Sequence, residues 1–233
     1  MKQEAVEFGH AWQSSKPGGI VHRRRALGGI VACAGLGLGF GGVAMAQEEV
    51  APGGQSMWVV PRTLWLQRDG VRGSLDLTYW QNGLLDVHRY REVCVFLRDT
   101  GFEKAILRGD KRILAAVRAG RLPERIPIAA PISPRVLDAL YAIGQWLAYF
   151  GLARPIIVTS AFRHSFYNNN MVEGASRDSF HTKARAVDIR IDGISPARIA
   201  LFARWLGVGG IGLYQSRGFL HIDDGAQRSW KGK

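Results

Sequence analysis

Three side chains in the last third of the chain have the types and the spacing of a metal site. His181 and Asp188 are separated by six residues, and His221 follows in a later apolar segment. A neutral imidazole and a carboxylate are both good zinc ligands, and a catalytic zinc ion uses three protein ligands and one open position. These residues therefore predict a Zn²⁺ site.

The same residues also have a plainer interpretation, in which two histidines and an aspartate form ordinary hydrogen bonds at the surface. The neighbouring sequence favours the metal. Short apolar segments at 186–191 and 219–223 are typical of strands, and Ser160-Ala161-Phe162-Arg163 follows another one. We expect one strand to present Asp188 near its start, another to carry His221, and a loop to carry His181.

Hydrophobic patterns elsewhere predict the elements that must position these residues. The clearest helix begins at Ser133-Pro134, an N-cap serine followed by proline at the first helical position, and ends before Gly151. Further helices are expected at 86–98, 110–119 and 196–206, and strands at 63–67, 74–80, 156–159, 186–191, 210–214 and 219–223. This order predicts a compact α+β arrangement.

The first 46 residues predict a signal peptide of the twin-arginine type. A basic region ends in three arginines at 23–25, a glycine-rich apolar run occupies 26–43, and Ala46 closes a small-x-small end suited to cleavage. Residues 47–61 are expected to form a flexible leader and 62–233 the folded domain. The protein is thus predicted to be periplasmic. As an alternative, the apolar run remains as a membrane anchor.

Charge and cysteine content narrow the function classes. The chain has 31 Lys and Arg against 19 Asp and Glu, a formal net charge of +12. The basic residues are scattered and the chain is expected to be exported, which argues against nucleic acid and favours an anionic cell-wall or membrane surface. Cys94 lies between valines and is expected to be a buried thiol, because removal of Cys33 with the signal peptide leaves no disulfide partner.

Motifs from about residue 62 to 230 resemble the murein endopeptidase K-like group of secreted bacterial zinc peptidases, related to D-Ala-D-Ala carboxypeptidases and vancomycin-resistance D,D-dipeptidases. That group has the patterns S-G-Y-R-S…N, S-x-H-x-x-G-x-A-x-D, G-F-x-H-x-D-x-G and a terminal S-W. Here they correspond, in the same order, to 160–165 with Asn168, 179–188, 218–225 and Ser229-Trp230. The resemblance implies a single-domain zinc peptidase fold, with a small antiparallel sheet carrying the ligands and helices flanking it.

Two departures from the group's pattern, and one difference from its carboxypeptidase relatives, bear on the site. Ala161 and Ala184 stand where the pattern has glycine, and an alanine at positive φ would be strained, so we expect a slightly altered loop at Ala184. Gly218 stands where the carboxypeptidase relatives place a carboxylate base, three residues before the second histidine. Relative to the pattern, residues 101–131 look like an insertion, which could serve as a lid, a substrate-selecting flap or a surface decoration.

Two further residues are predicted to be catalytic. Asp223 shares a strand face with His221 and is a candidate general base, although a carboxylate there could instead orient His221 or cap a turn. The resemblance implies that Arg163 lies near the metal, where it would bind a substrate carboxylate or the developing oxyanion. The alternative for Arg163 is an ordinary surface salt bridge.

The resemblance implies a zinc-dependent peptidase that hydrolyses stem-peptide bonds involving diaminopimelate in the cross-links of peptidoglycan. It leaves open L,D- or D,D-specificity, a need for an activator and the oligomeric state. One alternative is a non-catalytic, metal-containing cell-wall binding protein, supported by Gly218. Another is an exported basic protein that binds nucleic acid, whose affinity would fall steeply with salt and would not depend on metal.

Overall fold

A computed structural model describes residues 59–232. The predicted signal peptide, its possible role as an anchor, and the leader up to residue 58 lie outside the described residues. Within 59–232, no helix is both long enough and apolar enough to cross a membrane.

An eight-stranded sheet organises the described chain, with the strand order β3-β2-β1-β4-β5-β7-β6-β8. Two neighbouring pairs, β1 with β4 and β6 with β8, are parallel, and the others are antiparallel. The strands are β1 (Arg62–Arg68), β2 (Ser74–Gln81), β3 (Leu84–Leu85), β4 (Ile156–Ser160), β5 (Ala186–Arg190), β6 (Gly210–Tyr214), β7 (Phe219–Asp223) and β8 (Arg228–Lys231). The α+β class is confirmed, and the mostly antiparallel sheet extends beyond the strands that carry the predicted ligands.

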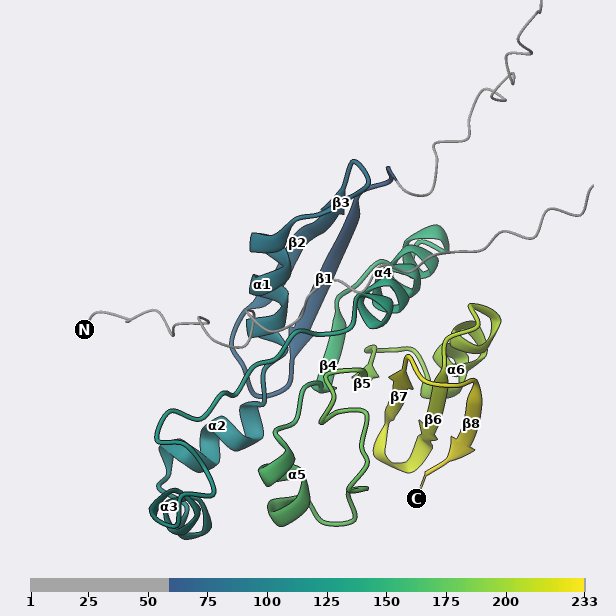
Figure 1. The fold of residues 1–233 in the computed structure, drawn as a ribbon. Helices are drawn as coiled ribbons and strands as arrows, with labels where there is room; N and C mark the ends of the chain where they lie inside the picture. Colours follow the sequence, from purple (N-terminus) through teal and green to yellow (C-terminus); the bar gives the residue numbers. More distant parts are fainter. Residues whose placement is uncertain (1–58, 233) are drawn as a thin grey trace, which may run out of the picture. The chain divides into compact units, whose positions relative to one another are not determined.

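Six α-helices accompany this sheet in the described residues (Figure 1). They are α1 (Val87–Phe96), α2 (Thr100–Leu107), α3 (Lys111–Arg118), α4 (Pro134–Tyr149), α5 (Ser165–Met171) and α6 (Pro196–Trp205). Helix α1 packs on β2, α4 on β1, and α6 on β6 and β7. Four elements were not predicted from the sequence: the helices α2 and α5 and the strands β3 and β8.

The core lies between these helices and the sheet. Helix α4 buries Leu137, Leu140, Ile143 and Leu147, the face that its apolar spacing predicted. Trp146 on the same helix stacks on Phe202 of α6, with ring centroids 4.6 Å apart. From the strands, the core receives Leu64, Leu66, Val158, Val187, Ile189, Leu220 and Ile222. A continuous apolar core therefore supports the strands that carry the candidate ligands.

Cys94 on α1 is 1% exposed, and its Sγ accepts a hydrogen bond from the backbone N–H of Ile132. Burial raises the pKa of this thiol, with smaller opposing effects from Ile132 and Tyr90. The thiol is therefore a poor nucleophile and fills the core, as the sequence predicted.

The segment expected to be an insertion, 101–131, contributes to a small core of its own. Phe102, Ile113, Ala116 and Leu122 are buried together, and Phe166 and Tyr167 of α5 pack against them. Asp99 caps α2 by accepting from the N–H of Phe102, and its second oxygen accepts from the N–H of His164. These contacts join α2 and α3 to the chain segment that follows Arg163.

Candidate metal centre

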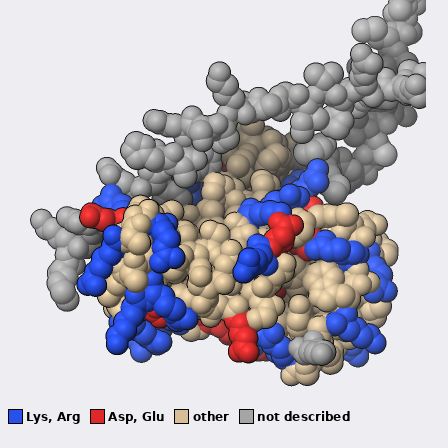
Figure 2. Space-filling model, turned by 60° about the horizontal axis from the view of Figure 1, so that its bottom comes forward, with Lys and Arg blue, Asp and Glu red and all other residues tan. Residues whose placement is uncertain are grey.

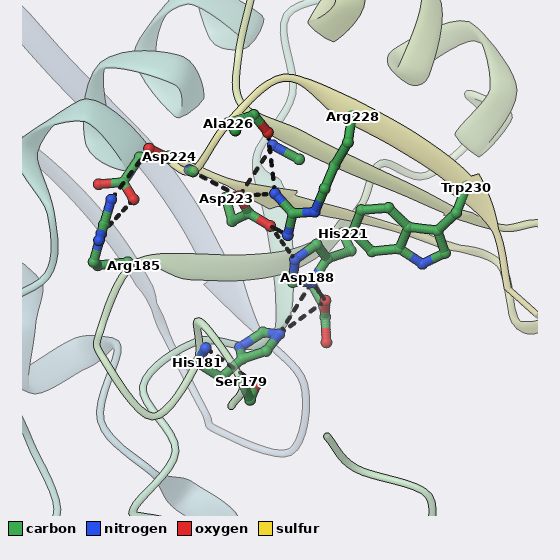
Figure 3. A network of polar contacts seen from close by, with 12 residues as sticks. Ser179, His181, Arg185, Asp188, His221, Asp223, Asp224, Ala226, Arg228 and Trp230 are labelled. Carbon is green, nitrogen blue, oxygen red and sulfur yellow. Dashed lines mark hydrogen bonds and ion pairs between the residues drawn. The ribbon is translucent and has the colours of Figure 1, made fainter. Parts of the chain in front are cut away.

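The paired strands β5 and β7 bring two of the three predicted ligands together. Asp188 and His221 are direct partners in the antiparallel register, and Nδ1 of His221 lies 2.8 Å from Oδ1 of Asp188. His181 comes from the loop before β5, and its Nε2 lies 3.1 Å from Nδ1 of His221 and 3.2 Å from Oδ1 of Asp188. The three side chains are buried, and their donor atoms converge on one point (Figure 3).

Hydrogen bonds on the far side of each imidazole fix which ring nitrogen faces this point. Nδ1 of His181 lies 2.8 Å from the carbonyl oxygen of Ala161, which can only accept, so Nδ1 carries the proton and Nε2 is free. Nε2 of His221 lies 3.0 Å from Oδ2 of Asp223, which leaves Nδ1 free. Metal-ligating histidines typically have such outer acceptors. The donor set therefore fits a divalent metal such as zinc.

Asp223 is held by many donors on the side of His221 away from the convergence point. Its side chain is 0% exposed, and its oxygens accept from the N–H groups of Gly210 and Gly225 and from two nitrogens of Arg228. Figure 3 shows the contacts of Asp223 with both Arg228 and His221. Of the two roles predicted for Asp223, this position favours orientation of His221 over proton transfer from water.

Two glycines on β6 make this packing possible. A Cβ at Gly210 would lie 2.3 Å from Oδ2 of Asp223, and one at Gly212 would lie 2.6 Å from the indole ring of Trp230. That indole lies beside the His221 ring, with centroids 5.3 Å apart. The absence of a Cβ at these two glycines thus lets the groups that surround His221 approach it.

Charge also stabilises the cluster. Burial alone would raise the pKa of Asp188, but His181 and His221 outweigh it and hold that pKa well below its ordinary value. For His221, burial lowers the pKa, while Asp188 and Asp223 raise it by more. The two carboxylates thus give the His221 ring a negatively charged surrounding that favours a cation at this point.

Arg163 lies beside the three predicted ligands. Its guanidinium donates to Oγ of Ser160 at 2.9 Å and to Oδ1 of Asn168 at 3.1 Å, and it lies 3.9 Å from Oδ2 of Asp188. Its backbone N–H donates to the carbonyl of His181. Ser160, Arg163 and Asn168 therefore act together to present a cation at the edge of the ligand cluster.

The loop that carries His181 keeps a glycine-like backbone at Ala184. Its φ is +55°, and its carbonyl accepts from the N–H of Ser133. The chain thus retains a left-handed residue and tolerates the strain of a Cβ there. Ser133 occupies the predicted N-cap position of α4, but its hydroxyl donates to Asp224 and makes no side-chain cap.

A pocket of about 310 Å³ opens at the ligand cluster. Its lining also includes residues to which the sequence analysis assigned no role in the site, although Phe180, Phe219 and Trp230 lie within the matched motifs: Glu173, Asp178, Phe180, Tyr214, Arg217, Phe219, Arg228 and Trp230. Alternation along β6 and β7 could have indicated Tyr214 and Phe219, because they lie one same-face step from Gly212 and His221. The others come from loops and β8, where no periodic signal exists.

A known protein family matches the part of the chain that forms this site. The model of the Peptidase M15 family matches residues 116–223, which span the three ligands and Arg163, and this identifies that part of the chain as a Peptidase M15 domain. The resemblance drawn from the sequence motifs is thereby confirmed. The match begins inside the segment 101–131 that was expected to be an insertion.

Curated relatives point to a narrower group. Peptidoglycan L,D-endopeptidase MepK of Escherichia coli (strain K12) is 34% identical over 102 residues, 42% of this chain and 54% of that protein. MepK of Shigella flexneri gives the same values. The probable peptidoglycan L,D-endopeptidase MepK of Haemophilus influenzae is 39% identical over 59 residues, 25% of this chain and 32% of that protein. The chain thus spans about half the length, or less, of these relatives, and no solved structure matches it significantly.

Proposed function

We propose that this protein is a zinc-dependent peptidoglycan endopeptidase that hydrolyses peptide cross-links between stem peptides. The observation that carries the proposal is the convergence of Nε2 of His181, Oδ1 of Asp188 and Nδ1 of His221 at the base of an open pocket. Homology to MepK supports the substrate class and favours the L,D-bond named for those relatives.

Zinc would be held by His181, Asp188 and His221. Bound there, it would supply a Lewis acid that activates water and polarises the scissile carbonyl. The protein's own contribution is to fix the ligands in advance: the Ala161 carbonyl holds His181, and Asp223 holds His221. Such outer partners typically account for roughly 10–100-fold in metal affinity or activity.

Arg163 is proposed to stabilise negative charge that develops on the substrate. Ser160 and Asn168 hold its guanidinium in place, so it needs little reorganisation when charge develops. We propose that Asp223 orients His221 and does not take the proton from water, because its oxygens are already occupied by His221, Arg228 and two backbone N–H groups.

A digest of intact sacculi tests the proposal. Purified mature protein, with zinc or with a chelator, is incubated with sacculi, and the products are read by mass spectrometry. We expect cross-linked dimers to disappear only with zinc, and the fragments to identify the bond. His181→Ala should abolish cleavage, whereas His88→Ala, which removes an exposed histidine on α1, should cleave as the wild type does.

The second candidate function is a non-catalytic, metal-containing cell-wall binding protein. The observation in its favour is Gly218, which leaves the turn before β7 without the carboxylate that the carboxypeptidase relatives carry. Zinc-replete protein that sediments with sacculi but leaves every cross-link intact would establish this alternative over the peptidase. Affinity for nucleic acid that falls steeply with salt and does not depend on metal would instead support an exported nucleic-acid-binding protein.

We further propose that residues 1–46 direct export to the periplasm by the twin-arginine route. The basis is the arginine run at 23–25 before a glycine-rich apolar stretch. Replacing Arg24 and Arg25 by lysine should retain a reporter fused to this segment in the cytoplasm. Export that is unaffected by this change, or a mature protein that retains the segment in the membrane, would refute the proposal.

A further inference from the structure

The turn between β6 and β7 places an arginine at the rim of the metal pocket. A 3₁₀ turn, Gln215–Arg217, and Gly218 at φ +72° connect the two strands, and Arg217 lines the pocket. The guanidinium lies 5.0 Å from the Phe219 ring centroid and 5.8 Å from that of Tyr214. These two rings are strand partners and stack on each other at 4.4 Å. We call Tyr214 and Phe219 the aromatic ledge.

Three arginines line the pocket, and two of them are already engaged. Arg228 donates to both oxygens of Asp223, and Arg163 donates to Ser160 and Asn168. The side chain of Arg217, by contrast, forms no hydrogen bond or ion pair with any of residues 59–232, and its guanidinium lies over the aromatic ledge. Stacking on aromatic rings orients a guanidinium while leaving its N–H donors free for an anion.

The position of Arg217 on the chain indicates how far it lies from His221 and so from the bond that would be cleaved. Phe219 and His221 are two residues apart on β7 and share a face, so their side chains are roughly 7 Å apart. Arg217 lies just beyond Phe219. An extended peptide advances about 3.3–3.6 Å per residue, so this arginine is suited to reach a group one to a few residues from the cleaved bond.

We propose that Arg217, seated on the aromatic ledge, binds a free carboxylate of the stem peptide and thereby selects the substrate and its register. The inference rests on the proposed function, because it assumes that a stem peptide occupies the pocket. Two sources offer this chemistry: the side-chain carboxylate of a diamino acid and the terminal carboxylate of the stem. A bidentate arginine–carboxylate pair suits either source.

The test uses one synthetic cross-linked peptide in three forms: unmodified, amidated at the diamino-acid side chain, and amidated at the terminus. We expect the zinc-loaded wild type to lose roughly tenfold in kcat/KM on one amidated form, as befits the loss of one charge-assisted hydrogen bond. Arg217→Ala should show a similar loss on the unmodified peptide and little further loss on amidation. The form that the wild type disfavours identifies the source.

Controls separate this role from a structural one. Arg217→Lys keeps the charge and should recover part of the selectivity, and Arg198→Ala, an exposed arginine on α6, should keep the full wild-type preference. If Arg217→Ala matches the wild type on the unmodified peptide, or loses equally on all three forms, Arg217 is an ordinary solvated arginine and the inference is overturned.

Failure of the proposed function gives a different result. In that case the zinc-loaded wild type cleaves none of the three peptides. Calorimetric titration of the unmodified peptide into wild type and Arg217→Ala then decides the inference without turnover. A roughly tenfold weaker affinity for the variant supports the carboxylate subsite. Equal affinities, or no binding to either protein, refute it.

Discussion

Two regions of the molecule contain a similar arginine–aspartate cluster and use it differently. Near β1 and β2, Asp138 of α4 accepts from Arg62 at 2.5 Å and from the hydroxyl of Tyr79 at 2.7 Å. Near β6 and β8, Asp223 accepts from Arg228 at 2.6 Å and from Nε2 of His221 at 3.0 Å. Asp138 joins segments that are distant in sequence, whereas the partners of Asp223 named here are two and five residues away along the chain.

The difference lies in what the aspartate holds. The hydroxyl of Tyr79 has a single polar atom, so its bond to Asp138 does not direct a second atom elsewhere, and the Asp138 cluster only joins α4 to the sheet. An imidazole has a second nitrogen, and by fixing Nε2 of His221, Asp223 directs Nδ1 toward Asp188 and His181. A structural ion pair becomes part of a functional site when one partner has a further donor atom aimed at a pocket.

The largest effect is expected from Asp223→Asn. An amide could donate to Nε2 of His221 and favour the tautomer whose proton sits on Nδ1, where it would oppose the metal. Zinc affinity should fall roughly 10–100-fold, measured by competition with a chelator. Normal zinc affinity combined with loss of kcat would instead make Asp223 the general base.

The next largest effect is the pH dependence of zinc binding, which should distinguish the Asp223 cluster from the Asp138 cluster. The pKa of His221 is raised by Asp188 and Asp223 against the effect of burial, and zinc requires the neutral ring. As pH falls through this raised pKa, zinc affinity should drop by roughly tenfold per pH unit, starting at higher pH than for a free histidine. Burial and Asp138 raise the pKa of Tyr79 above its ordinary value, so this hydroxyl does not titrate over the same range.

Asp138→Ala should affect folding and leave the metal site intact. It removes the acceptor of the buried Tyr79 hydroxyl and of Arg62, and an unsatisfied buried group costs about 1–3 kcal/mol. Chemical denaturation should show this loss, while zinc affinity should match that of the wild type. A parallel loss of zinc affinity would mean that the two clusters are coupled.

The smallest effect is expected from relieving backbone strain, which is compared at one positive-φ residue in each region. Asn82, in the turn between β2 and β3, and Ala184, in the His181 loop, both have positive φ, at 52° and 55°. Asparagine tolerates this conformation and alanine does not, so Ala184→Gly should stabilise the fold by about 0.5–1 kcal/mol. Asn82→Gly should change the melting temperature less. Equal shifts would indicate that the loop does not hold Ala184 under strain.

Much of this architecture was predictable because its signals are local. Serine and proline at 133–134 and the apolar spacing along α4 predicted that helix and its buried face. Short apolar segments likewise predicted β5 and β7, and residue types predicted the ligands. Helices α2 and α5 were missed because each is short and takes its apolar contacts from the other, through Phe102, Phe166 and Tyr167.

The sequence by itself predicted the ligand types and the strands that carry two of them, since these depend on residue chemistry and on alternation along a strand. The position of Arg163 near the site was implied by the resemblance of its motif to the zinc peptidase group. Only the tertiary structure decided which nitrogen of each histidine faces the candidate metal site and that Arg228 engages Asp223. It also decided that the Arg217 side chain has no hydrogen-bond or ion-pair partner among residues 59–232. Those outcomes depend on contacts between β6, β7, β8 and distant loops. Pairing register and close backbone approach at Gly210 and Gly212 set such contacts, and neither leaves a periodic pattern along the chain.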